Sequence, residues 1–267
     1  MKIKLCGIRT IDDVHLINEA KPDFCGFIVE FPKSFRSVSE SELRKLTAQV
    51  SPEIKKVGVF VNAQKNLVIR LLQEHVIDLA QLHGQEDNNY IEEIQSRTGK
   101  MVIKAFSIKT KEDVERALQS PADYILLDQG NGGTGQTFDW SLVPEINRPW
   151  FLAGGLGADN LQTAITRLHP WGIDLSSSLE TNRKKDPAKI KQIMELKLSE
   201  YTTHHSDAIG DLPAEGSASV PPQLNPRYRT LYITKNPPLQ GTLERSVLSD
   251  RLLVAYVPLP AEGSASV

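Results

Sequence analysis

The sequence predicts an α/β fold: a (β/α)8 TIM barrel followed by a largely irregular C-terminal tail. Short apolar runs alternate with longer amphipathic stretches over the first 200 residues, and this alternation is typical of a parallel sheet with right-handed crossovers. Eight such units of roughly 25 residues each are present, which is the number that closes a barrel. The first run is followed by CGIRT instead of a GxGxxG fingerprint, which argues against an open dinucleotide-binding sheet.

The expected strands are continuous runs rich in Val, Ile, Leu and Phe, the pattern of strands buried on both faces. They comprise residues 3–6, 24–29, 56–61, 79–82, 102–106, 124–127, 150–153 and 172–176. Amphipathic helical patterns lie between them, at residues 12–20, 64–75, 89–98, 112–119 and 160–168. A last helix is expected to begin at Asp186-Pro187, an N-cap residue followed by proline at the first helical position, and to end near residue 198.

Residues 201–267 differ in composition from the rest of the chain. They hold 8 of the 16 prolines, and the nonapeptide LPAEGSASV occurs in them twice, at residues 212–220 and 259–267. A segment such as AEGSAS is typical of a linker and cannot form an apolar core. We therefore expect a barrel domain at residues 1–200 and a Pro-rich, linker-like extension at residues 201–267 that is mostly disordered. Two apolar runs interrupt the extension, at residues 230–234 and 252–258.

Composition and charge exclude several classes of protein. The chain is 40% hydrophobic and 24% charged, which is ordinary for a globular protein and unlike a wholly disordered chain. It contains no run of about 18 apolar residues, so we expect that the chain is not a membrane protein. The formal net charge is −2, which predicts no charge-driven binding to nucleic acid or to an anionic membrane.

The two cysteines, Cys6 and Cys25, are too few for a disulfide framework or for a zinc site made of cysteines alone. The first residues lack the apolar core of a secretory signal. We therefore expect a cytoplasmic protein with reduced thiols. Cys25 lies within an apolar run and is interpreted as a buried structural residue.

In a TIM barrel the reacting groups lie at the C-terminal ends of the strands. Cys6 ends the first strand, where its thiolate is a candidate general base or nucleophile, or its thiol simply packs. Asp128 ends the sixth strand and is a candidate general acid, or an acid that caps a turn. The glycine-rich loop at 130–135 that follows is expected to close over a substrate. Gln81 and His83 share one face at the end of the fourth strand.

Two loops carry signals for phosphate. Gly154 and Gly155 follow the seventh strand, and Ser176 and Ser177 follow the eighth. In TIM barrels these two loops often bind phosphate through backbone N–H groups, and glycines allow the close approach. The two signals together predict a small phosphorylated substrate. Arg36, in the loop after the second strand, suits a carboxylate or phosphate, or is simply solvated.

The sequence resembles phosphoribosylanthranilate isomerase, an enzyme of tryptophan biosynthesis, over about residues 1–190. The matching segments, in family order, are KLCGIRT, GFIVEFPKSFRSVS, VGVFVN, QLHGQE, LLDQGNGGTGQTFDW, FLAGGLGADN and GIDLSSSLE followed by KKD. The resemblance implies the Amadori rearrangement of N-(5-phosphoribosyl)anthranilate to 1-(2-carboxyphenylamino)-1-deoxyribulose 5-phosphate, without cofactor or metal. The tail has no counterpart in the family. We expect a monomer, with a dimer as the alternative.

The resemblance also implies roles for individual residues. Asp128 would be the general acid that protonates the furanose ring oxygen, and Cys6 the general base that takes the proton from C2′. This chemistry requires a lowered pKa for Cys6 and a proton held by Asp128 near neutrality. Arg36 would face the anthranilate carboxylate. The other implied substrate-binding residues are Gly154, Gly155, Ser176 and Ser177 around the phosphate, with Gln81 and Asp174 lining the same mouth.

One departure from the family is Ser178, which stands where a glycine commonly lets the backbone approach the phosphate.

Three alternatives remain. The first is a different phosphate-handling barrel enzyme. Indole-glycerol-phosphate synthase would need lysine and glutamate at strand ends, a ribulose-phosphate epimerase would need metal-binding histidines, and neither set occurs at the expected strand ends. A catalytically inactive sugar-phosphate binder is disfavoured because both Cys6 and Asp128 are present. The third alternative is a barrel whose tail is the working part in an interaction.

Overall fold

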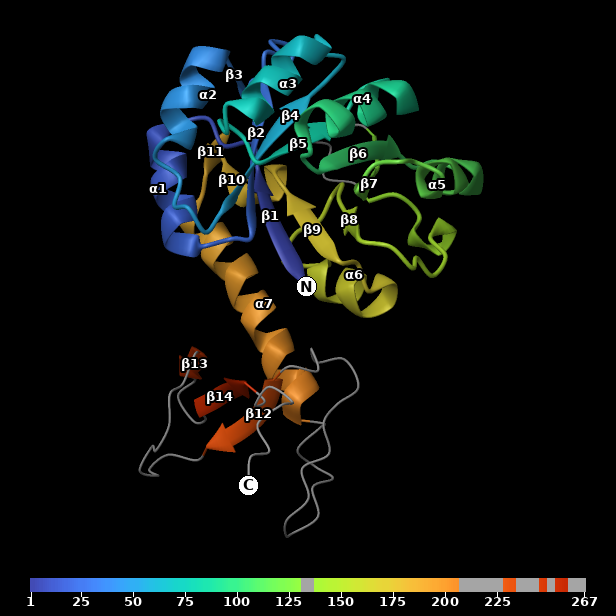
Figure 1. Cartoon of the computed structure of the whole chain (residues 1–267). Coiled ribbons are helices and arrows are strands. Elements are labelled where there is room, and N and C mark those ends of the chain that lie inside the picture. The colour runs from blue at the N-terminus through green and yellow to red at the C-terminus, as the bar shows by residue number, and fades with distance from the viewer. Residues whose placement is uncertain (131–136, 207–227, 234–244, 249–252, 259–267) are drawn as a thin grey trace, which may run out of the picture. The chain divides into compact units, whose positions relative to one another are not determined.

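The computed structural model of the chain describes residues 1–130, 137–206, 228–233, 245–248 and 253–258. Its side chains are described at residues 1–130 and 137–196. The chain divides into two compact units, Met1–Ser206 and Asp207–Val267. The elements are labelled in Figure 1.

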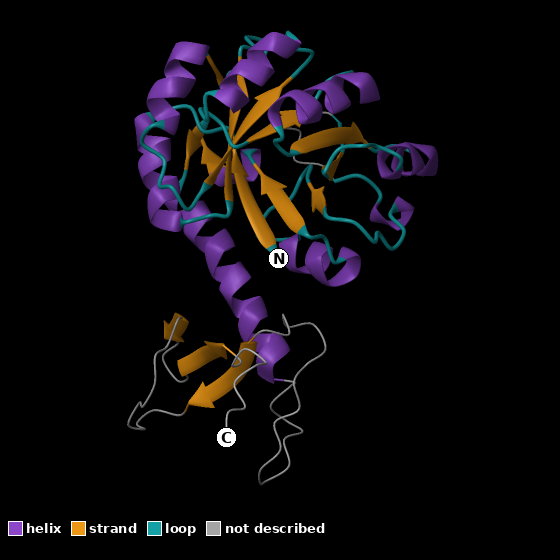
Figure 2. Cartoon of the chain, viewed as in Figure 1, coloured by secondary structure: helices purple, strands orange, loops and turns teal. Residues whose placement is uncertain are grey.

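The first unit is a closed barrel of parallel strands (Figures 1 and 2). The barrel strands are β1 (Lys2–Cys6), β2 (Phe24–Val29), β4 (Lys55–Phe60), β5 (Leu79–Leu82), β6 (Val102–Ser107), β7 (Tyr124–Asp128), β8 (Trp150–Leu152) and β9 (Gly172–Leu175). They are hydrogen-bonded in the order β1-β9-β8-β7-β6-β5-β4-β2, and β2 pairs with β1 to close the ring. The predicted TIM barrel is confirmed, and each expected strand overlaps one of these. The short β3 (Ser37–Val38) pairs in parallel with the last two residues of β2.

Helices cover the outside of the barrel (Figure 2). They are α1 (Ile11–Ala20), α2 (Glu40–Thr47), α3 (Lys65–Gln73), α4 (Asn88–Thr98), α5 (Lys111–Leu118), α6 (Leu161–Leu168) and α7 (Pro187–Ser206). α7 begins at the expected proline, and Asp186 Oδ1 accepts a hydrogen bond from the Ala188 amide at 2.9 Å. The helix then continues eight residues past the expected end at residue 198.

Two helical regions differ from expectation. α2 is absent from the expected helices because only Leu43 and Leu46 form its buried apolar stripe; a capping box between Ser39 and Glu42 starts it. Between β7 and β8 the described chain forms only the 3-10 helix η1 (Trp140–Leu142). The count of eight complete βα units is therefore wrong at this point. The segment VPEINRP that leads into β8 holds two prolines, which interrupt helices.

Alternation along the strands divides the core into two layers. In β1, Ile3 and Leu5 belong to the large apolar cluster between strands and helices. The inner layer includes Phe24, Tyr124, Phe151 and Trp171, whose rings contact one another edge-on or tilted, as in the 5.6 Å pair of Phe24 and Phe151. Since Phe24 and Tyr124 begin their strands, these rings fill the N-terminal end of the barrel and leave the chemistry to the other end.

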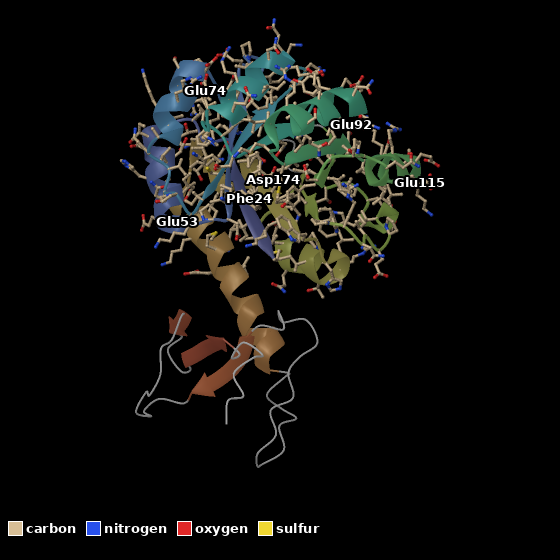
Figure 3. All side chains as sticks on the ribbon, viewed as in Figure 1. Phe24, Glu53, Glu74, Glu92, Glu115 and Asp174 are labelled. Atoms are coloured by element: carbon tan, nitrogen blue, oxygen red, sulfur yellow. The ribbon has the colours of Figure 1, made fainter. Side chains whose placement is uncertain are left out.

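Figure 3 labels Phe24 and Asp174 toward the middle of the barrel and Glu74, Glu92 and Glu115 around its periphery. These three glutamates are exposed. Three short elements follow β9: η2 (Ser177–Leu179), then β10 (Glu180–Thr181) paired with β11 (Lys184–Lys185). They bring the segment before α7 back to the C-terminal end of β1, where Lys185 Nζ donates to the Cys6 carbonyl at 2.7 Å.

In the second unit the structure describes an antiparallel sheet of three strands in the order β12-β14-β13. The strands are β12 (Tyr228–Ile233), β13 (Arg245–Leu248) and β14 (Leu253–Pro258). The apolar runs noted at residues 230–234 and 252–258 overlap β12 and β14. Within the described part of the whole chain, no helix is both long and apolar enough to span a membrane.

Candidate active site

Side chains alternate along β1, and Ile3 and Leu5 pack outward against the helices. Lys4 and Cys6, which alternate with them, therefore face the interior of the barrel. β9 lies next to β1 with Lys4 opposite Asp174. Gln81 on β5 and Asp128 at the end of β7 face the same interior and are 1% and 7% exposed. Four residues predicted from separate strand ends thus meet at one mouth: Cys6, Gln81, Asp128 and Asp174.

Cys6 lies beside a buried ion pair. Lys4 Nζ is 2.8 and 2.9 Å from the two carboxylate oxygens of Asp174, and the exposed fractions of the two side chains are 0% and 9%. The Lys4 ammonium and the Cys6 sulfur also share one place in the barrel, because a Cβ added to Gly26 would lie 3.0 Å from the first and 2.6 Å from the second. Burial raises the pKa of the Cys6 thiol, and the nearby cations Lys4 and Lys185 oppose this without reversing it. The direction of this shift is opposite to the one that the base role of Cys6 requires.

Asp128 is held by a short hydrogen-bonded relay. Gln81 Nε2 donates to His83 Nδ1 at 3.0 Å, and His83 Nε2 lies 3.2 Å from Asp128 Oδ2. The Gln129 amide donates to Asp128 Oδ1 at 2.8 Å. Burial raises the pKa of Asp128, but the hydrogen bonds and charge of His83 with the backbone amides outweigh it, so the net shift is downward. The direction of this shift is opposite to the one that the acid role of Asp128 requires.

Arg36 is fixed by an acidic partner that is distant in sequence. Its Nε and Nη2 both lie 2.7 Å from the carboxylate oxygens of Glu180. Glu180 Oε1 also accepts from Lys185 Nζ at 3.0 Å. Lys185 in turn donates to the carbonyls of Cys6 and Ser176. This network ties Arg36 to the end of β1, and two of its guanidinium nitrogens are used by Glu180.

The two loops expected to bind phosphate lie beside the candidate acid and the candidate base. Gly154 and Gly155 have φ angles of +82° and +64°. A Cβ on Gly154 would lie 2.5 Å from Asp128 Oδ1, so the first glycine packs directly against the candidate acid. Ser176 Oγ donates to the Cys6 carbonyl at 3.2 Å, and Ser177 begins η2. The two loops therefore lie beside Asp128 and Cys6 respectively.

Ser178 lies in η2 and has no left-handed φ angle, so its backbone does not require glycine. Its hydroxyl oxygen is buried without a hydrogen-bond partner among the described residues. Ser178 also lines a cavity of about 400 Å³ whose other walls are Gly157, Ala158, Asp159, Lys189, Gln192 and Ile193. The glycine-rich segment expected to close over a substrate falls largely on residues 131–136, which lie outside the described residues.

Sequence reasoning missed three charged residues of this site: Lys4, Glu180 and Lys185. It noted His83 but gave it no role. A signal for Lys4 existed, because a lysine two positions before Cys6 in an apolar strand must share its inward face. No comparable signal marks Glu180 or Lys185, whose partners are set by the turn between β10 and β11.

Comparisons with known proteins show the family. Residues 3–196 match the family model described as N-(5′-phosphoribosyl)anthranilate (PRA) isomerase. The chain belongs to the PRA isomerase family. A PRA isomerase of Endomicrobium trichonymphae is 39% identical over 199 residues, which cover 73% of this chain and 97% of that protein. Because the match is to this family, the alternatives of a synthase or an epimerase are wrong.

Solved PRA isomerases share the barrel. The crystal structure of the Thermotoga maritima PRA isomerase has a TM-score of 0.66 and 35% identity, covering 73% of this chain and 97% of that one. A second, with a TM-score of 0.64 and 33% identity, covers the same shares and holds reduced 1-(o-carboxyphenylamino)-1-deoxyribulose 5-phosphate. The family match ends at residue 196, before the second unit begins.

Proposed function

We propose that this barrel isomerises N-(5′-phosphoribosyl)anthranilate with Asp128 as general acid and Cys6 as general base. The observation that carries the proposal is the convergence of these two side chains at one mouth of the barrel, connected through Asp174. Asp174 accepts hydrogen bonds from Lys4, which lies beside Cys6. The charges of His83 and Asp128 also act on the Asp174 carboxylate. An acid and a base at one sugar-sized site can move protons in sequence.

The first step belongs to Asp128. Its proton passes to the furanose ring oxygen as the bond between that oxygen and C1′ breaks, and the anthranilate nitrogen supplies its lone pair to form a protonated Schiff base. Cys6 as thiolate then takes the proton from C2′, and the electrons of that bond form an enolamine. The enolamine tautomerises to the aminoketose product. All atoms of the substrate remain in the product, so the reaction needs no co-reactant.

The ligand-free protein favours the opposite protonation of this pair. The pKa of Asp128 is lowered and that of Cys6 is raised, whereas the first step needs a protonated carboxyl and the second needs a thiolate. The productive form is therefore a minor one in the free enzyme. The groups that favour it are Lys4 beside the sulfur and the low polarity around Asp128, where burial alone raises the carboxyl pKa.

Substrate recognition follows from the flanking residues. The substrate phosphate would bind at Gly154, Gly155, Ser176 and Ser177, where the loops after β8 and β9 meet. Arg36 would face the anthranilate carboxylate, held in place by Glu180, and Gln81 would line the mouth beside His83. A relative from Thermotoga maritima is described as dimeric; for this chain we keep the monomer as the proposal, with the dimer as the alternative. Reduced thiols at Cys6 and Cys25 fit the cytoplasm as its location.

A fluorescence assay with freshly prepared phosphoribosylanthranilate tests the proposal. We expect Cys6→Ala and Asp128→Ala each to lower kcat by at least about 100-fold, the usual contribution of a general acid or base. Circular dichroism and thermal unfolding should show that both variants remain folded. Near-normal turnover by Asp128→Ala would make the assignment of the acid wrong, and an inactive but folded wild-type chain would make the proposed function wrong.

A further inference from the structure

Lys4 is a charged side chain with no exposed surface, and it exchanges no proton with the substrate in the steps above. It is 0% exposed and lies inside the barrel between β2 and β9. A buried ammonium is costly unless its protons and charge are matched. It donates to the two oxygens of Asp174, at 2.8 and 2.9 Å, and its charge also acts on the Cys6 side chain.

The neighbouring strand leaves room for this contact. A Cβ on Gly26 would lie 2.6 Å from Cys6 Sγ and 3.0 Å from Lys4 Nζ. Sulfur and ammonium therefore both lie directly over Gly26, and any larger residue would push them aside. The sequence of β2 thus keeps a glycine where the two side chains meet.

We propose that Lys4 is a positioning residue that holds Cys6 over Gly26 and stabilises its thiolate, with Asp174 sharing the charge of the ammonium. The proposal rests on the proposed function, in which Cys6 is the general base. A thiolate formed in this buried site loses its hydration, so it needs a cation in contact. Burial lowers the pKa of Lys4, but the attraction of Asp174 and Cys6 raises it above its ordinary value, so the cation persists.

The other charged and titratable groups near Cys6 are accounted for. Lys185 from β11 donates its three protons to the Cys6 carbonyl, the Ser176 carbonyl and Glu180, so its charge reaches the sulfur without a hydrogen bond. Cys25 from β2 is fully buried. Across the mouth, His83 and Asp128 act on Asp174. Among these described residues, Lys4 is thus the cation whose ammonium lies over the same glycine as the Cys6 sulfur.

The rate of Cys6 alkylation by iodoacetamide as a function of pH tests the proposal. Mass spectrometry of the Cys6 peptide separates its reaction from that of Cys25. We expect Lys4→Met to move the midpoint up by about one pH unit or more, because the cation is lost. We expect Asp174→Asn to move it down, because the carboxylate that competes for the ammonium and repels the thiolate is lost. A residue that served only the fold would not produce opposite shifts.

A matched control is Lys104→Met. Lys104 is also buried in the barrel wall, 5% exposed, and its Nζ pairs with Glu86 at 3.1 Å. Its loss should lower the thermal midpoint as the loss of Lys4 does, while leaving the Cys6 alkylation midpoint unchanged. In the isomerase assay, Lys4→Met should lower kcat about tenfold with little change in KM, and Lys4→Arg should restore part of kcat, because a guanidinium keeps the charge.

A folded Lys4→Met chain with an unshifted Cys6 midpoint overturns the proposal. If Lys4→Met does not fold, Asp174→Asn decides, because an unchanged or raised midpoint in that variant is equally contradictory. The alkylation experiment uses no substrate. If both variants shift the midpoint in the expected direction but the wild-type chain has no isomerase activity, the proposed function is refuted. The pairing of Lys4 with Cys6 then still stands.

Discussion

His83 Nε2 lies 3.2 Å from Asp128 Oδ2, and the opposite ring nitrogen of His83 accepts from Gln81 Nε2 at 3.0 Å. An amide nitrogen only donates, so with this orientation of Gln81 the proton of a neutral His83 sits on Nε2 and points at Asp128. The relay therefore favours the carboxylate form of Asp128. The reaction needs the carboxylic acid form, so this relay opposes the protonation that the first step requires.

The pH dependence of kcat/KM should show this relay. With Asp128 required protonated and Cys6 required deprotonated, the lowered pKa of Asp128 and the raised pKa of Cys6 make kcat/KM nearly level at neutral pH. It should fall below the pKa of Asp128 and above that of Cys6. In His83→Ala the hydrogen bond that lowers the Asp128 pKa is lost, so the acidic limb should move to higher pH.

The matched control for this profile is His15→Ala. His15 lies exposed on α1, on the outside of the barrel, and its loss should leave both limbs where they are in the wild type. An acidic limb that stays in place in a folded His83→Ala chain would mean that Asp128 is not the group titrating there.

Gly154 should be intolerant of a side chain for a reason specific to the site. A Cβ there would lie 2.5 Å from Asp128 Oδ1 and 2.7 Å from the Gln129 amide nitrogen, and its φ of +82° is already unfavourable for alanine. We expect Gly154→Ala to lower kcat/KM by about 100-fold or more, because a displacement of about 1 Å in a reacting group has that effect. Steady-state kinetics measure it.

Gly99 provides the comparison for Gly154. It ends α4 with a φ of +64°, and a methyl group added to it would have none of the described atoms outside its chain neighbours within 4 Å. Gly99→Ala should therefore cost about 1 kcal/mol of stability from its backbone alone and leave kcat/KM unchanged. Equal kinetic effects of the two substitutions would show that backbone strain, and not the contact with Asp128, accounts for the loss at Gly154.

Much of the barrel is predictable because its strands are buried on both faces, so each is a continuous apolar run with clear ends. Cys6 and Asp128 are predictable because they stand where such runs stop. Lys4 is easily missed because a lysine within an apolar run interrupts the pattern instead of completing it. The pKa directions of Cys6 and Asp128 cannot be read from the sequence, since they depend on a balance between burial and neighbours that only the folded chain sets.

The link between Arg36 and Glu180 shows what pattern reading cannot reach. The two residues are 144 positions apart, and they meet because β10 and β11 fold back toward the loop after β2. The side-chain exposures of 14% and 8% make this a largely buried pair, whose fixed geometry matters more than its net contribution to stability.

Glu180→Gln should therefore weaken substrate binding more than turnover. Without the carboxylate, Arg36 loses the partner that orients its guanidinium, and Lys185 loses one of its three acceptors. We expect KM for phosphoribosylanthranilate to rise about tenfold, equivalent to about 1.4 kcal/mol, with a smaller change in kcat. Glu93→Gln should leave KM unchanged, because the substitution removes a 41% exposed carboxylate that pairs with Arg97 on α4. A KM unaffected by Glu180→Gln would remove Arg36 from the binding site.

Residues 207–267 should be dispensable for folding and for catalysis. The family match ends at residue 196, and the compact unit that holds the barrel ends at Ser206. Within α7, Ile190 and Ile193 are 3% and 2% exposed in the barrel core, so a deletion must leave this helix in place. A chain ending at Ser206 should show the thermal midpoint and kcat/KM of the barrel in the full chain. An insoluble or inactive product would mean that the second unit supports the barrel, whereas a chain ending at Lys185 should fail to fold because the packing of Ile190 and Ile193 is lost.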